Sequence, residues 1–231
     1  IFAIGVITVA IILAIYLSPK PQQFFEKGIS LNKEQKYNDA IIQFDKALSI
    51  NQNYSDAWLG KGDSLRLLKK YPEAIECYNK VISLDPNNLK AWYNKGITYN
   101  SLSNYSEAIE CFDKAISINP KYVAAWNSRG NSLRNLQKYP EAIESYDKVI
   151  SLDPKNLNAW YNKGLSYNSL KEYSEAIECF DKAISINPNN INAYYNKGIS
   201  YISLKNYPQA IRTFEKVLSI DPKYAAAWVG I

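Results

Sequence analysis

Histidine is absent from the 231-residue chain, and so is methionine. The lack of histidine removes the commonest general base and the commonest metal ligand of proteins. The sequence also has no P-loop, no G-x-G-x-x-G and no G-x-S-x-G pattern. Catalysis needs convergent groups with matched pKa values, whereas the acids here recur along the chain at equivalent positions. We therefore expect no enzyme activity, no cofactor and no metal within these residues.

Cysteine is scarce, and neither sign of charge dominates. Lysine and arginine exceed the acids by 27 − 22 = +5, and the charges alternate without forming a basic block. This balance does not indicate a nucleic-acid partner. Cys77, Cys111 and Cys179 occupy one recurring position. Neighbouring repeats stack about 10 Å apart, one helix diameter, which is too far for a disulfide. We expect three reduced packing residues.

Aromatic and small residues recur along the sequence with a period of 34 residues. Trp58, Trp92, Trp126 and Trp160 follow it, and Trp228 comes two periods after Trp160. Small residues keep the same period four positions after the aromatic series and again near the middle of each copy. They are Gly28, Gly62, Gly96, Gly130, Gly164 and Gly198, and Ala40, Ala74, Ala108, Ala142, Ala176 and Ala210. The sequence therefore predicts an array that grows by repetition around no single central core.

Each copy reads as two helices. In residues 55–88, apolar residues recur at helical spacing in the first half, and the stretch from Lys69 interrupts them. Pro72 can start the second helix because its missing N–H would have no partner there anyway. In the next copy Ser106 takes that place as an expected N-cap. Asp85 precedes a proline and should end the second helix.

The small and large residues of one copy are complementary. Gly62 and Ala74 are expected to let the two helices approach closely, while Tyr78 and Trp58 fill the remaining gaps. One helical hairpin cannot bury its apolar faces alone, so three or more copies must stack.

The pattern W-x3-G…Y…A-x3-F…A…P at a spacing of 34 resembles the tetratricopeptide repeat family. The resemblance covers residues 21–224 as six copies, 21–54, 55–88, 89–122, 123–156, 157–190 and 191–224, with residues 225–231 opening a seventh. Gln52 departs from it by replacing the closing proline of the first copy. The resemblance implies an all-α solenoid, a right-handed superhelix of stacked antiparallel helix pairs whose first helices line a concave face.

Residues 1–17 carry no charge and are followed by the linker 18–20. They predict an N-terminal transmembrane helix, slightly short of a 30 Å hydrocarbon core; a cleaved secretory signal is the alternative. Lys20, Lys27 and Lys33 follow closely, so the positive-inside rule predicts a single-pass membrane protein with cytoplasmic repeats. The missing methionine and the incomplete seventh copy predict a fragment of a longer product.

Polar residues on the first helices suggest a ligand groove. A helical wheel turns positions two, five, nine and twelve of each copy inward, with position six at the margin. Asparagine can pair with a peptide backbone, tyrosine adds contact area, and arginine can bind a carboxylate. The candidate groove residues are Arg66, Tyr93, Asn94, Asn100, Asn131, Arg134, Tyr161, Asn162, Asn168, Tyr195 and Asn196.

These columns are similar to the asparagine ladder in the repeats of O-linked N-acetylglucosamine transferases. The alternative is that these polar residues only keep the face hydrated, and that duplication of the repeats preserved them. Residues 55–122 and 123–190 match at most positions, and position twelve alternates arginine with asparagine. That longer period predicts groove chemistry that alternates with two-repeat spacing.

Position seven of each copy is a lysine or arginine, where the family usually has leucine. Its members are Lys27, Lys61, Lys95, Arg129, Lys163 and Lys197. Such stems can lie along apolar surface while the charged end reaches water. We interpret this column as structural, with second-helix acids such as Glu76, Glu110, Asp113 and Asp181 as partners.

The sequence therefore favours a non-catalytic, membrane-anchored scaffold that binds an extended segment of a partner protein, with no small-molecule substrate. Two alternatives stay open. One is the recognition arm of a larger enzyme, such as a glycosyltransferase or a sensor kinase. The other is a structural array that assembles with itself.

Overall fold

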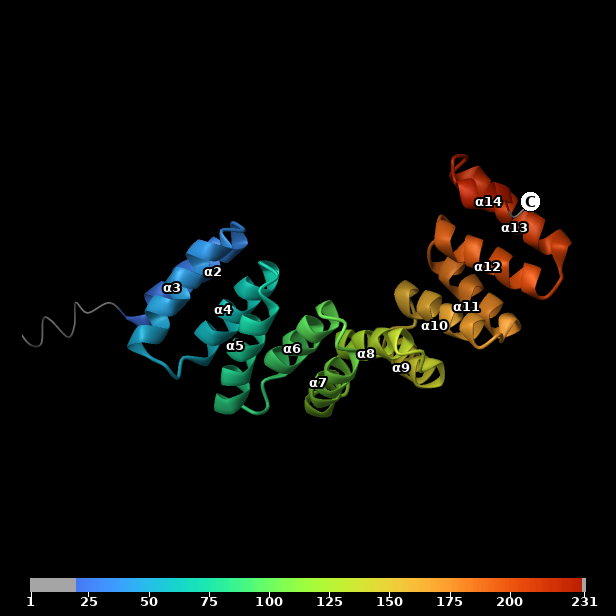
Figure 1. Cartoon of the computed structure of the whole chain (residues 1–231). Helices are drawn as coiled ribbons and strands as arrows, with labels where there is room; N and C mark the ends of the chain where they lie inside the picture. Colours follow the sequence, from blue (N-terminus) through green and yellow to red (C-terminus); the bar gives the residue numbers. More distant parts are fainter. Residues whose placement is uncertain (1–19, 230–231) are drawn as a thin grey trace, which may run out of the picture. The chain divides into compact units, whose positions relative to one another are not determined.

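The computed structural model describes residues 20–229, which form helices and turns (Figure 1). The first helices of the predicted repeats are α2 (Pro21–Lys33), α4 (Ser55–Leu67), α6 (Leu89–Ser101), α8 (Val123–Asn135), α10 (Leu157–Ser169) and α12 (Ile191–Ser203). The second helices are α3 (Tyr37–Ile50), α5 (Tyr71–Leu84), α7 (Tyr105–Ile118), α9 (Tyr139–Leu152), α11 (Tyr173–Ile186) and α13 (Tyr207–Ile220). Helix α14 (Ala225–Val229) follows.

The described chain forms two compact units, divided within α6 after Thr98. In the first unit α2 packs on α3, α3 on α4 and α4 on α5, and α2 also contacts α4. In the second unit each helix from α7 to α14 packs on the next helix along the chain, and α10 contacts both α8 and α12. Each unit is thus a stack of helical hairpins in which successive first helices touch, as the repeat pattern predicts.

The predicted helix boundaries are mostly confirmed, with one correction. Helix α5 begins at Tyr71 with Pro72 in its first turn, and it ends before Asp85. Ser106 is not an N-cap, because α7 begins at Tyr105 and the capping position is Asn104. The physical reason is the preceding turn, in which the Asn104 N–H bonds the Tyr99 carbonyl and the chain re-enters a helix earlier than expected.

The turn between the two helices of each hairpin has one non-glycine residue in the left-handed conformation. Its φ lies between 59° and 64° in Gln35, Lys69, Ser103, Gln137, Lys171 and Lys205. In the first unit the N–H of Lys70 then donates to the Leu65 carbonyl at 2.8 Å. This is the Schellman arrangement that satisfies the last carbonyls of a helix. The sequence analysis did not anticipate it, because these residue types rarely adopt positive φ.

The glycine column makes room for an aromatic ring. A Cβ placed on Gly164 would lie 2.7 Å from Cε1 of Phe180, and one on Gly62 would lie 2.8 Å from Cε1 of Tyr78. Both rings are fully buried, as is Ala74. The predicted complementarity of small and large residues is therefore confirmed, and it sets how closely the two helices of a hairpin approach.

The tryptophan side chains donate hydrogen bonds to the turns that join successive repeats. The indole Nε1 of Trp58 donates to the Gln52 carbonyl at 2.8 Å, and that of Trp160 donates to the Pro154 carbonyl at 3.0 Å. Trp92, Trp126 and Trp228 make the same bond six residues back. Because the acceptor is a backbone carbonyl, Gln52 serves as well as proline, which explains that departure from the family pattern.

The predicted transmembrane helix, residues 1–17, lies outside the described residues. Among residues 20–229, no helix is both long enough and apolar enough to cross a membrane.

Candidate functional site

Side-chain hydrogen bonds join the first helices of successive repeats, and they come in two alternating kinds. In the first kind, a serine at position ten donates to an asparagine at position twelve of the preceding repeat. The pairs are Ser64 with Asn32 at 2.8 Å, Ser132 with Asn100 at 2.8 Å, and Ser200 with Asn168 at 2.7 Å. Asn100 and Asn168 were predicted to line the groove, and the structure places them in contacts between repeats.

The second kind occurs where position twelve is an arginine. Arginine has no acceptor atom, so it cannot receive a bond from position ten. Here the position-six amide donates instead to position nine of the preceding repeat. Asn94 Nδ2 lies 2.8 Å from Asp63 Oδ1, and Asn162 Nδ2 lies 3.1 Å from Asn131 Oδ1. These bonds between repeats alternate with two-repeat spacing, and an alternation of the groove's ligand chemistry stays a prediction.

The position-nine oxygen also accepts from a buried phenol of the same repeat. Tyr78 Oη lies 2.8 Å from Asp63 Oδ1, and Tyr146 Oη lies 2.8 Å from Asn131 Oδ1. We call Asp63, Arg66, Tyr78 and Asn94 the first cluster, and Asn131, Arg134, Tyr146 and Asn162 the second cluster. The first cluster lies within the first unit and the second within the second unit.

Asp63 and the two phenols were not among the groove residues predicted from the sequence. A signal for them was present in the pattern. Tyrosine occupies this place in the two copies whose position twelve is arginine, whereas the other copies have Phe44, Phe112, Phe180 and Phe214. The hydroxyl and the guanidinium occur together because the arginine of each copy hydrogen-bonds the phenol of the same copy.

Burial governs the electrostatics of both clusters. Desolvation raises the pKa of the Asp63 carboxyl, and this effect outweighs the opposing hydrogen bonds from Tyr78 and Asn94 and the charge of Arg66. Burial likewise raises the pKa of Tyr146 to about 12, against the opposing charge and hydrogen bond of Arg134. Burial also raises the pKa of Tyr78, reinforced by the neighbouring Asp63. Both phenols are therefore neutral donors at physiological pH.

The raised pKa of Asp63 predicts a pH-dependent gain from Asp63→Asn. As pH rises from about 3.8, the unfolded chain loses this proton before the folded chain does, so wild-type stability falls through that window and then stays lower. Asparagine removes the buried charge and keeps the acceptor, as Asn131 does in the second cluster. We expect the variant to be more stable than wild type at pH 7 and no more stable at pH 3, by urea unfolding followed by circular dichroism. A variant less stable at pH 7 would contradict the assignment.

The remaining candidates lie near the end of the second unit, apart from Tyr93, which is half-buried on α6. Asn196 Nδ2 donates to Tyr161 Oη at 3.1 Å and to the Asn192 carbonyl at 2.9 Å. The Tyr161 ring packs at 5.9 Å from Phe180, measured between ring centroids. The Tyr195 ring packs in the same way on Phe214 and Tyr224. Most of the predicted groove residues thus also hold neighbouring repeats together.

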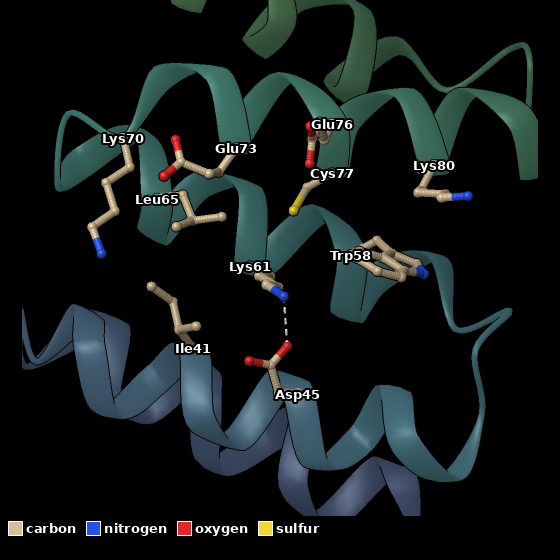
Figure 2. Close-up of a pocket in the computed structure, with 10 residues that line it drawn as sticks. All are labelled: Ile41, Asp45, Trp58, Lys61, Leu65, Lys70, Glu73, Glu76, Cys77 and Lys80. Carbon is tan, nitrogen blue, oxygen red and sulfur yellow. Dashed lines mark hydrogen bonds and ion pairs between the residues drawn. The ribbon is translucent and has the colours of Figure 1, made fainter.

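The position-seven cations form ion pairs with the preceding second helix. Lys61 Nζ lies 2.6 Å from Asp45 Oδ1 (Figure 2). The other pairs are Arg129 with Asp113 at 2.7 Å, Lys163 with Asp147 at 2.5 Å, and Lys197 with Asp181 at 2.5 Å. The structural interpretation and the partners Asp113 and Asp181 are confirmed. Glu76 and Glu110 are not the acids of these four pairs, which come from a position three residues later.

Arg129 also bonds a side chain on the second helix of its own repeat. Its Nη1 donates to Ser145 Oγ at 2.7 Å, at the position where three other copies have a cysteine. Cys77, Cys111 and Cys179 are buried thiols, as predicted. Burial raises the pKa of Cys77 to about 11 and that of Cys179 to about 12, so both stay protonated at neutral pH. Such thiols are packing groups, because reactivity requires the thiolate.

A cavity of about 440 Å³ lies over α4 between α3 and α5. Figure 2 shows Trp58, Lys61 and Cys77 facing it, with the Lys61–Asp45 pair beside them. Charges of both signs line this cavity, and its one thiol is protonated. It offers no convergent set of reactive groups, so we place the candidate site on the inner faces of the first helices.

The fold and the inter-repeat contacts define an all-α solenoid of stacked helical hairpins. Family models described as "Tetratricopeptide repeat" match residues 89–122, 157–190, 191–224 and 111–144, and one described as "TPR repeat" matches 62–103 and 130–170. The chain belongs to the tetratricopeptide repeat family. No curated protein sequence matches it.

Several solved structures share the fold. "Crystal structure of MamA protein" is 30% identical and covers 74% of this chain and 93% of its own, with a TM-score of 0.71. "Crystal structure of YrrB: a TPR protein with an unusual peptide-binding site" is 22% identical and covers 80% and 96%, with a TM-score of 0.71. MamA from Desulfovibrio magneticus RS-1 is 21% identical and covers 74% and 96%, with a TM-score of 0.70.

Proposed function

We propose that this chain is a non-catalytic scaffold, tethered to a membrane by residues 1–17, that binds an extended segment of a partner protein along its first helices. The observation that carries the proposal is the row of amides, phenols and guanidinium groups that, within each unit, continues from one first helix to the next. A continuous row of donors and acceptors suits a partner whose own groups repeat regularly, and an extended main chain is such a partner.

Two further points support the proposal. The uncharged residues 1–17 followed by Lys20, Lys27 and Lys33 favour an anchor with the repeats on the cytoplasmic side. YrrB, which shares the fold, is described as having a peptide-binding site.

The proposal is tested by selecting displayed random dodecapeptides on the full chain and mapping where they bind. A selected peptide carrying benzoylphenylalanine is cross-linked, and the attachment points are read by mass spectrometry. We expect attachment to α8, α10 or α12. Attachment to α9 or α11, or no selectable peptide, would overturn the proposed groove.

Two exposed positions supply a matched pair of blocking variants. Asn158 lies on α10 one turn before Tyr161, and Glu178 lies on α11. Asn158→Trp should place a large ring across the groove and weaken the selected peptide by about tenfold, a typical effect of about 1.4 kcal/mol. Glu178→Trp should leave the affinity within about twofold, because second helices do not line the groove.

A further inference from the structure

Helix α8 carries two buried polar atoms that make no hydrogen bond within the protein. They are Asn127 Oδ1, an acceptor, and Arg134 Nε, a donor. Asn127, Asn131 and Arg134 are spaced by four and three residues, so all three lie on one face of the helix. Nearly all buried polar atoms in folded proteins have a partner. On this face of α8, Asn127 Oδ1 has no donor, and the Arg134 guanidinium, which hydrogen-bonds Tyr146, keeps its Nε without an acceptor.

The charge around α8 is unbalanced. The helices α8, α10 and α12 contain no aspartate or glutamate. Their cations Arg129, Lys163 and Lys197 are each paired with an acid from a second helix. Arg134 takes part in no ion pair within residues 20–229. Its charge acts on Tyr146 and Tyr161, which are both neutral phenols.

The duplicated copy on α4 also has an unpaired donor, Arg66 Nε, but it lacks the unpaired amide acceptor and carries an acid beside its arginine. Leu59 replaces Asn127, and Asp63 replaces Asn131 beside the equivalent Arg66. Asp63 feels the charge of Arg66, so the first cluster holds one acid and one base. The second cluster holds the base without the acid. Asp56 also stands where α8 has Ala124, so α4 carries two acids that α8 lacks, and α8 is the more positive of the two helices.

We propose that the inner face of α8 anchors an acidic side chain of the bound polypeptide. The Arg134 guanidinium binds the aspartate or glutamate carboxylate, and the half-buried Asn127 amide rotates outward to accept a backbone N–H from the same segment. Seven residues separate Asn127 from Arg134, about 10 Å along the helix, a distance that about three residues of extended chain cover. This assignment rests on the proposed function and specifies the chemistry of its ligand.

The test uses the full chain and the tightest dodecapeptide from the display selection, with both termini blocked so that only a side chain can supply a carboxylate. We expect that peptide to contain an aspartate or glutamate. Changing it to the matching amide should weaken binding by about tenfold to a hundredfold in fluorescence anisotropy, the usual range for a charged hydrogen bond. Arg134→Gln should cause the same loss and leave the amide peptide unaffected. Arg212→Gln, the matched control at an exposed position of second helix α13, should stay within about twofold.

Asn131→Asp provides a second, nearly isosteric variant that reproduces the first cluster. The new carboxylate should neutralise Arg134 and weaken the acidic peptide by about tenfold or more, with an unchanged circular dichroism spectrum. Equal binding of the acidic and amide peptides, or unchanged affinity in Arg134→Gln and Asn131→Asp, would overturn the anchor. If those peptides still cross-link to the first helices, the proposed groove survives; if none binds, both proposals fall.

Discussion

Replacement of Phe180 by alanine is expected to lower the free energy of unfolding by about 3–5 kcal/mol, the range for deleting a buried aromatic ring. Phe180 is fully buried and packs with Ala176, Ala183 and Ala193. Across the hairpin it meets Gly164, which has no side chain, while the Tyr161 ring and Leu165 also pack against this cluster. These larger side chains would have to leave their own contacts to fill the cavity, so the cost should lie within this range.

The loss should be local, because each repeat in a solenoid contacts only its neighbours. We expect urea unfolding to begin at lower denaturant and hydrogen exchange to accelerate in α10, α11 and α12. Exchange in α2 and α3 should be unchanged. The matched control is Glu178→Ala on the exposed side of α11, with an expected effect within about 0.5 kcal/mol. Uniform acceleration over both units would contradict the nearest-neighbour picture.

Gly164→Val tests the same contact from the other helix, and we expect a loss of about 3 kcal/mol. A β-carbon alone would lie 2.7 Å from Phe180 Cε1, closer than real contacts permit. Alanine would recover up to about 1 kcal/mol in helix propensity, whereas valine adds two more methyl groups between α10 and α11. Overpacking of this kind costs about 1–3 kcal/mol or more.

Ser169→Val is the control for that experiment, because it introduces the same side chain at an exposed position of the same helix. Its effect should stay within about 0.5 kcal/mol. The midpoints of thermal and urea unfolding measure both variants. Equal midpoints for the two valine variants would show that α10 and α11 can separate without cost, against the packing described above.

Much of this protein could be predicted from local pattern. The 34-residue period indicated two helices in each copy, and Gly62 with Tyr78 correctly indicated a close helix pair. Ser106 was misread because the left-handed residue Ser103, which has no sequence signal of its own, moves the start of α7. The candidate groove was harder to predict, since a polar residue on an inner face has the same pattern whether it meets a ligand or a neighbouring repeat.

The sequence alone determined the repeat, the helix pairs and the aromatic and small-residue columns, because these follow from spacing along a single chain. Only the tertiary structure decided the partners of the polar residues. Asn94 meets Asp63 and Asn162 meets Asn131 because the stagger of adjacent first helices brings position six beside position nine. Asn127 Oδ1, Arg66 Nε and Arg134 Nε have no partner in this packing. Such matches depend on packing between repeats, which no single repeat encodes.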